Sequence, residues 1–187
     1  MKRIAILILV IVAIADPIQG HANKMNVVTT STMVTDMVKS VGGRRVSVVG
    51  LMGPGVDPHL YKPASGDVVK LQRAKVIFYS GLMLEGRMSD LFFRMSRAGK
   101  KVYAVTESIP EKNRLEPPEF EGHWDPHVWG NPSLWSKCVE TVVEGLSEAG
   151  ITNIQIASFV NPKRVPQMAF AEDLASRIDR IKGIEFS

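Results

Sequence analysis

The sequence predicts an α/β fold in which a parallel sheet is flanked by helices. Two observations predict it. Short runs rich in β-branched residues recur along the chain, without the polar alternation of a half-exposed strand. The segments between these runs carry apolar residues at helical spacing. Because buried strands that alternate with helices form βαβ units, this order favours a parallel sheet over an antiparallel one.

Four runs are predicted as strands, and each is bounded by Gly, Ser, Thr or charged residues that end a strand. They cover residues 26–30, 46–51, 76–80 and 102–106.

Helices are predicted between the strands. Residues 31–41 place Met33, Met37 and Val41 among their apolar positions, and residues 67–74 are predicted as a second helix. In residues 84–98, Leu91, Phe92 and Met95 are expected to face inward, and Arg87, Arg94 and Arg97 to face solvent. A further helix is expected to begin near Pro132, since proline suits the first turn of a helix.

The amino-terminal end has the pattern of a secretory signal peptide. Lys2 and Arg3 precede a twelve-residue apolar run over residues 4–15, and small residues follow up to Ala22. The run is shorter than the ~20 residues of a membrane span. We therefore expect residues 1–22 to be removed and the chain to be exported to the periplasm.

Composition narrows the class of protein. The net charge of +4 among 187 residues gives no sign of nucleic-acid binding. Cys138 is the single cysteine, so the chain cannot form an internal disulfide, and a buried position in a helix is expected for it. Its distance from Ala22 predicts that no lipid anchor follows the signal peptide.

The sequence Asp-Pro-His occurs twice, as Asp57-Pro58-His59 and Asp125-Pro126-His127. Proline fixes its own φ and favours extended geometry in the residue before it, so each histidine follows a stiff turn. Two imidazoles on stiff loops suggest a transition-metal site. The residues alone leave two interpretations open for His59 and His127: metal ligands, or surface and capping histidines.

Both histidines follow predicted strands, and ligands of parallel α/β sheets gather outside the carboxyl ends of the strands. His59 and His127 are therefore expected to reach one rim of the sheet. His123 lies four residues before His127, but Pro126 disfavours a helix there, so His123 is predicted in a loop. His21 lies beside the cleavage point and is assigned no role.

Asp57 and Asp125 have two interpretations. They could be metal ligands, but a residue two positions before a histidine is better suited to hydrogen-bond its own loop. Three tryptophans surround the second motif, namely Trp124, Trp129 and Trp135. An aromatic platform for stacking is possible for them, and core packing with a dry wall for the metal site is favoured.

Around these motifs the chain resembles a known family. Residues 53–59 with Tyr61, Pro63 and Asp67, and residues 125–129 with residues 134–135, are similar to the zinc- and manganese-binding receptors of ABC transporters. The resemblance implies a periplasmic receptor that captures Zn²⁺ or Mn²⁺ and delivers it to the membrane permease of an ABC transporter. It also implies that His59 and His127 are the two metal ligands of the first of two α/β lobes.

The second lobe of that family supplies two more ligands, and no counterpart is recognisable after His127. Residues 25–150 are therefore expected to form the amino-terminal metal-binding lobe. Residues 151–187 are expected to contain a divergent segment and part of the bridging helix, with apolar spacing over residues 166–182, and the second lobe is expected to be missing. Two imidazoles alone predict weak, open coordination.

Two other functions remain open from the sequence. A secreted metal-dependent hydrolase could use two histidines, a carboxylate and a bound water, although the chain has no His-Glu-x-x-His motif. A non-functional fragment of the receptor is the other alternative. The receptor, which performs no covalent chemistry, is favoured.

Overall fold

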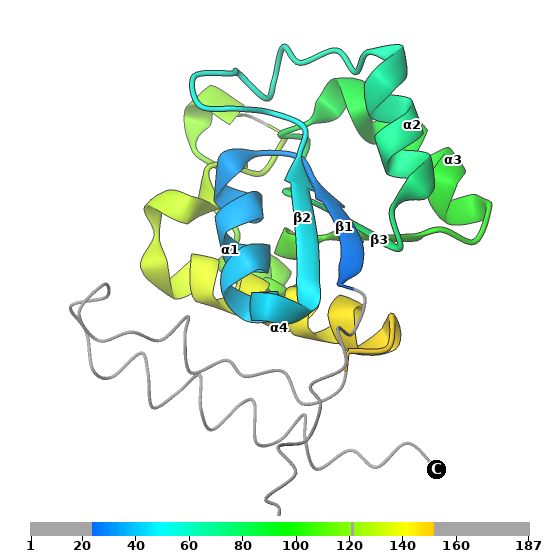
Figure 1. Cartoon of the computed structure of the whole chain (residues 1–187). Helices are drawn as coiled ribbons and strands as arrows, with labels where there is room; N and C mark the ends of the chain where they lie inside the picture. Colours follow the sequence, from blue (N-terminus) through cyan, green and yellow to red (C-terminus); the bar gives the residue numbers. More distant parts are fainter. Residues whose placement is uncertain (1–23, 121, 152–187) are drawn as a thin grey trace, which may run out of the picture.

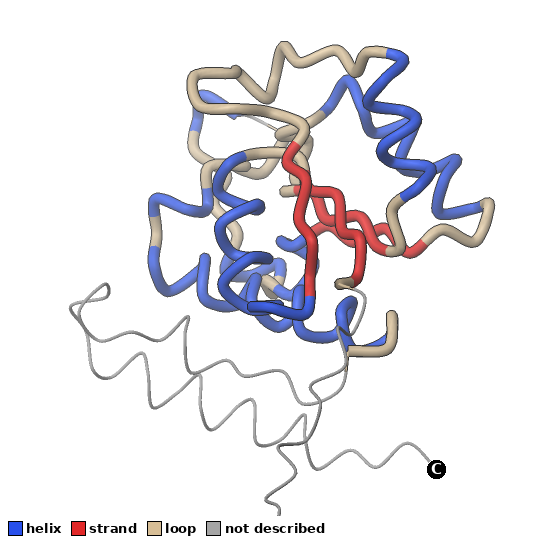
Figure 2. Tube along the Cα trace, viewed as in Figure 1, coloured by secondary structure: helices blue, strands red, loops and turns tan. Residues whose placement is uncertain are grey.

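A computed structural model describes residues 24–120 and 122–151 of the chain. Four parallel strands form one sheet in the order β2-β1-β3-β4, and helices surround it (Figures 1 and 2). The strands are β1 (Met25–Thr29), β2 (Val46–Gly50), β3 (Val76–Tyr79) and β4 (Lys101–Ala104). The predicted parallel sheet is confirmed, and each strand lies within two residues of its predicted bounds.

Helices cover both faces of the sheet. One face packs against α1 (Thr32–Gly42) and α4 (Pro132–Glu148) in a buried cluster that includes Val34, Phe78 and Val142. The opposite face packs against α2 (Ser65–Arg73) and α3 (Ser89–Arg97), where Leu71, Ile77 and Phe92 are buried. Because apolar side chains of the central strands β1 and β3 are buried on both faces of the sheet, these two strands need no polar alternation, which explains their continuous apolar sequence.

Local capping sets where the helices on the first face begin. The Ser31 hydroxyl accepts a hydrogen bond from the amide of Val34 at the start of α1. The Asn131 side chain accepts from the amides of Ser133 and Leu134, so α4 starts at Pro132 as predicted.

The third helix is shorter than the prediction of residues 84–98. It begins at Ser89, because the chain before it folds into a tight, irregular turn. Leu82 and Met83 adopt positive φ angles of 48° and 63°, and Glu85 turns its carboxylate into the protein, where the side chain is 2% exposed.

Three donors hold the buried carboxylate of Glu85. It accepts hydrogen bonds from the Thr30 hydroxyl at 2.5 Å, the Ser80 amide at 2.9 Å and the Gly81 amide at 3.3 Å. Gly81 has a φ of 93°, and a Cβ there would lie 2.4 Å from the Thr106 hydroxyl. Periodicity alone could not show this turn, since the donors come from the ends of two strands.

Cys138 lies fully buried in α4, as predicted, and burial raises the pKa of its thiol to about 12. Among the residues that the structure describes, none of the helices is long and apolar enough to cross a membrane. The predicted signal peptide, residues 1–22, and the predicted helix over residues 166–182 lie outside the described residues.

The Glu85 carboxyl predicts a pH-dependent contribution to stability. Burial raises its pKa above the ordinary 4.5, against the hydrogen bonds from Thr30, Ser80 and Gly81 that lower it. The folded state therefore holds the proton more tightly than the unfolded chain does, so this contribution is fully present below pH 4.5 and declines as pH rises through the raised pKa of the folded state. Urea unfolding should show the stability advantage of wild type over Glu85→Gln shrinking as pH rises.

Glu148→Gln provides a control of opposite sign. A hydrogen bond from Tyr103 holds the Glu148 pKa below its ordinary value. The advantage of wild type over this variant should therefore grow as pH rises. A wild-type advantage over Glu85→Gln that stays constant with pH would contradict the buried-carboxyl interpretation.

Candidate metal centre at the rim of the sheet

The two predicted histidines meet, although they are 68 residues apart in the chain. Their Nε2 atoms lie 3.2 Å from each other, and the ring centroids are 5.3 Å apart. His59 comes from the loop that follows β2 and arches over one end of the molecule in Figure 1. His127 comes from the irregular segment between β4 and α4. The expectation that both reach one rim is confirmed.

Each histidine is held by its own Asp-Pro-His turn in the same way. The Asp57 carboxylate accepts a hydrogen bond from the amide of His59 at 2.9 Å. The Asp125 carboxylate accepts from the amide of His127, also at 2.9 Å. The interpretation of both aspartates as residues that hydrogen-bond their own loops is therefore confirmed.

The His127 ring has further partners. Its Nδ1 lies 2.7 Å from the Asp125 carboxylate. Because a carboxylate accepts, this contact assigns a proton to Nδ1, so Nε2 of the neutral ring is an acceptor that faces His59 Nε2. The Trp129 ring meets the His127 ring edge to face at 5.2 Å, and Phe120 lies 5.9 Å away. These aromatic rings fix the imidazole from the side.

The loop that carries His59 is fastened where it leaves the sheet. The amides of Leu51 and Met52 donate to the carbonyls of Thr29 and Thr30, which extends the β1–β2 pairing past the end of β2. Thr30 also donates to Glu85, so the buried carboxylate supports the start of this loop.

Asp67 fastens the other end of the loop. Its carboxylate accepts from the Tyr61 hydroxyl at 2.7 Å, the Ala64 amide at 3.0 Å and Lys70 Nζ at 2.9 Å. The bond to Ala64 caps α2, which explains why this helix begins at Ser65, two residues before the predicted start.

The pKa values of this pair follow from their contacts. Burial raises the Asp67 pKa, but the hydrogen bonds from Lys70, Tyr61 and Ala64 outweigh burial and hold it below 3.8. Burial and the bond to Asp67 raise the pKa of Tyr61 to about 12. At neutral pH, Tyr61 therefore stays a neutral phenol that donates a hydrogen bond to the ionised carboxylate of Asp67.

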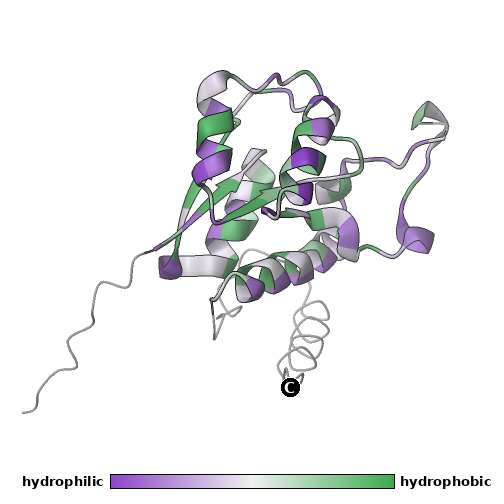
Figure 3. Cartoon of the chain, turned by 90° about the vertical axis from the view of Figure 1, so that its right-hand side faces the viewer, coloured by the Kyte–Doolittle hydropathy of each residue, from purple (hydrophilic) through white to green (hydrophobic). Residues whose placement is uncertain are grey.

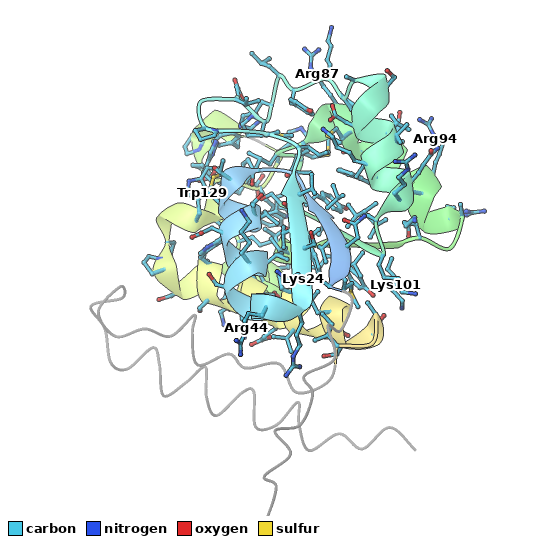
Figure 4. The ribbon with its side chains drawn as sticks, in the orientation of Figure 1. Lys24, Arg44, Arg87, Arg94, Lys101 and Trp129 are labelled. Carbon is cyan, nitrogen blue, oxygen red and sulfur yellow. The ribbon has the colours of Figure 1, made fainter. Side chains whose placement is uncertain are left out.

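The remaining predicted residues have separate places. His123 is exposed in a loop, as predicted. Trp135 packs against the core cluster of α1 and α4, which confirms core packing for this residue, while Trp129 contacts the His127 ring. Figure 4 labels Trp129 at the end of the molecule toward which β2 points. Trp124 is half-buried.

Two residues that hold the candidate site in place, Phe120 and Glu85, were not predicted from the sequence. Phe120 contacts His127 from a loop that reads as polar and proline-rich in sequence. Glu85 occupies a position that helical periodicity assigns to a helix. The one sequence signal for its turn is Gly81 directly after a strand.

The paired nitrogens suit one tetrahedral ion. With Zn–N bonds of ~2.0–2.1 Å and tetrahedral angles, two ligand nitrogens lie about 3.3 Å apart, close to the observed 3.2 Å. Among the described residues, no cluster of three or more His, Cys, Asp or Glu side chains is arranged to hold a metal. This part of the chain thus offers two imidazole nitrogens.

Tyr61→Phe is expected to loosen the His59 loop. The variant removes the donor to Asp67 and should lower the free energy of unfolding by about 1 kcal/mol. Hydrogen exchange should speed up selectively in residues 52–64, as measured by mass spectrometry. Tyr103→Phe removes a comparable bond to Glu148 and is the control. Unchanged exchange in the loop of Tyr61→Phe, or equal change in both variants, would contradict this role.

Comparison with known proteins agrees with this architecture. The chain is 43% identical over 126 residues to the manganese-binding lipoprotein MntA of Bacillus subtilis. It is 48% identical over 120 residues to the zinc-binding protein TroA of Treponema pallidum. The matches cover 67% and 64% of this chain but 40% and 38% of those proteins. The chain therefore spans about two fifths of the length of these relatives.

Solved structures show the same fold. The periplasmic zinc-binding protein TroA of Treponema pallidum superposes with a TM-score of 0.67 and 39% identity, over 82% of this chain and 53% of that one. Zn(II)-bound AdcA of Streptococcus pneumoniae gives a TM-score of 0.59 and 28% identity, over 85% of this chain and 31% of that one.

A family model matches residues 27–155, which include strands β2 to β4, most of β1, both Asp-Pro-His turns and α4. This chain belongs to the family of the periplasmic zinc-uptake complex component A, the metal-binding proteins of ABC transporters.

Proposed function

We propose that the protein is a periplasmic receptor that captures Zn²⁺ or Mn²⁺ through His59 and His127 and passes it to the permease of an ABC transporter. The observation that carries the proposal is the 3.2 Å separation of the two Nε2 atoms at the rim of the sheet. Family membership supports transport as the use of the bound ion.

The environment of His127 supports a role as ligand. Asp125 holds the proton on Nδ1, so the Nε2 lone pair faces the other imidazole. A carboxylate on the far nitrogen of a metal-binding histidine orients the ring and makes the ligating nitrogen more basic. The His127 side chain is 42% exposed, which leaves the nitrogen accessible to an incoming ion.

Two imidazoles leave about half of a four-ligand shell to other donors. We therefore expect weak binding by this chain, with water completing the coordination. Nitrogen ligands also hold Zn²⁺ more tightly than Mn²⁺, by the general order of divalent metal affinities. The protein should therefore bind Zn²⁺ with higher affinity than Mn²⁺ in solution, whichever ion it transports.

We also propose that the protein is exported to the periplasm. Residues 1–22 are proposed as a cleaved signal peptide, and the mature protein as free of a lipid anchor. Relatives such as MntA are lipoproteins. In this chain the single cysteine, Cys138, is buried in α4, where an acyl chain has no access.

Calorimetric titration tests the proposed ligands. The full chain should bind one Zn²⁺, and more weakly one Mn²⁺, while His59→Ala/His127→Ala should lose this stoichiometric binding. His123→Ala removes an exposed loop histidine nearby and should bind as wild type does. Unchanged affinity in the double variant would refute the site. Metal-dependent turnover of ester or phosphoester substrates, lost in the double variant, would instead assign the site to a hydrolase.

The two aspartates offer a matched pair for testing the role of Asp125. Both accept the amide of their histidine at 2.9 Å, but the one described ring contact among these turns joins Asp125 to His127. Asp125→Ala should weaken Zn²⁺ binding at least ~10-fold, because the ring loses its orienting carboxylate. Asp57→Ala should weaken it less. Equal losses would show that both aspartates act through the backbone alone.

A further inference from the structure

The amino-acid sequence contains a basic stretch followed by an acidic stretch. Residues 62–101, which contain α2 and α3, hold nine Lys and Arg but three Asp and Glu. Residues 102–151 hold three Lys and Arg but nine Asp and Glu. Charge is therefore unevenly distributed along the chain, with most of the excess positive charge in residues 62–101.

The basic region forms a surface on α2 and α3, which lie side by side when the molecule is turned as in Figure 3. We call this surface the α2–α3 face. Three carboxylates lie in this stretch: Glu85 is buried, Asp67 binds Lys70 and Tyr61, and Asp90 is exposed. The exposed basic side chains outnumber them, and they are Lys62, Lys70, Arg73, Lys75, Arg87, Arg94 and Arg97.

Apolar side chains project from the same face. Phe93 is 64% exposed and Met83 is 62% exposed. Met83 lies against Ser89, whose hydroxyl is 3.9 Å from its sulfur, and Ser89, Phe93 and Arg97 follow at four-residue spacing along α3. The Arg97 guanidinium lies 5.9 Å from the centre of the Phe93 ring. This side of α3 thus carries the exposed Phe93 ring beside Arg97, and Met83 lies next to its first turn.

The arginines do not converge on one point. Figure 4 shows Arg87 and Arg94 extending away from the protein at well-separated positions. Charges spread over a surface suit an extended anionic partner better than a small anion. Arginine forms bidentate contacts with phosphate, and its stem can lie along apolar groups while its head reaches the phosphates.

We propose that the α2–α3 face docks on an anionic membrane surface, with Phe93 and Met83 entering the headgroup layer and the arginines binding lipid phosphates. Apolar side chains flanked by cationic ones match the boundary between acyl chains and headgroups. An acidic protein surface is the alternative partner for the arginines, and it predicts no binding to protein-free vesicles. The proposal does not depend on metal binding at His59 and His127, since neither residue belongs to this face.

Sedimentation with vesicles tests the proposal on the full chain. Binding is expected to phosphatidylcholine vesicles that contain phosphatidylglycerol, to weaken with salt, and to be lost on pure phosphatidylcholine. Arg87→Gln/Arg94→Gln/Arg97→Gln should lower the partition coefficient about 100-fold, because each cationic side chain near an anionic membrane contributes separately. Phe93→Ser should also lower it.

Lys24→Gln/Lys39→Gln/Arg44→Gln is the matched control, because it removes the same charge from exposed sites, and Figure 4 shows Lys24 and Arg44 far from Arg87 and Arg94. Circular dichroism checks that each variant is folded. Absence of wild-type binding to the anionic vesicles, or equal losses in the two triple variants, would overturn the proposal. Salt-sensitive self-association without vesicle binding would assign the face to the acidic region of a second copy and would also overturn it.

Discussion

The parallel direction of all four strands is the constraint on which the contact between His59 and His127 depends. Because the strands run the same way, the loops that leave β2 and β4 start at one end of the sheet. These strands are nevertheless the two outer strands, with β1 and β3 between them. The loops must therefore extend across the rim before His59 and His127 can meet, and the Asp-Pro-His turns fix each histidine at the end of that path.

The rim is also where the fold accepts buried polar groups. The Glu85 carboxylate accepts hydrogen bonds from Thr30, at the end of β1, and from the amides that follow β3. The carbonyl of the same Thr30 accepts a hydrogen bond from the loop that leads to His59. A buried carboxylate is costly unless donors surround it. Here three donors do, and the positive φ angles at Leu82 and Met83 are tolerated because the turn is held from both strands.

The two proposed activities occupy different parts of the molecule and use different physics. The imidazole pair relies on short-range geometry, since a displacement of a few tenths of an ångström would change its fit to an ion. The α2–α3 face relies on summed charge and exposed apolar area, which tolerate displacement but respond to salt. The two proposed sites are joined by α2, because Asp67 supports the His59 loop from the first turn of this helix.

The sequence by itself determined the local features: the apolar strands, the amphipathic helices, the start of α4 at Pro132 and the two stiff turns before His59 and His127. Each depends on residues close together in the chain. The tertiary structure decided the separation of the imidazoles, the contact of Phe120 with His127 and the shortening of α3 by Glu85. These depend on donors and rings that only folding brings together, because strand order and loop path, unlike periodicity, are set by long-range packing.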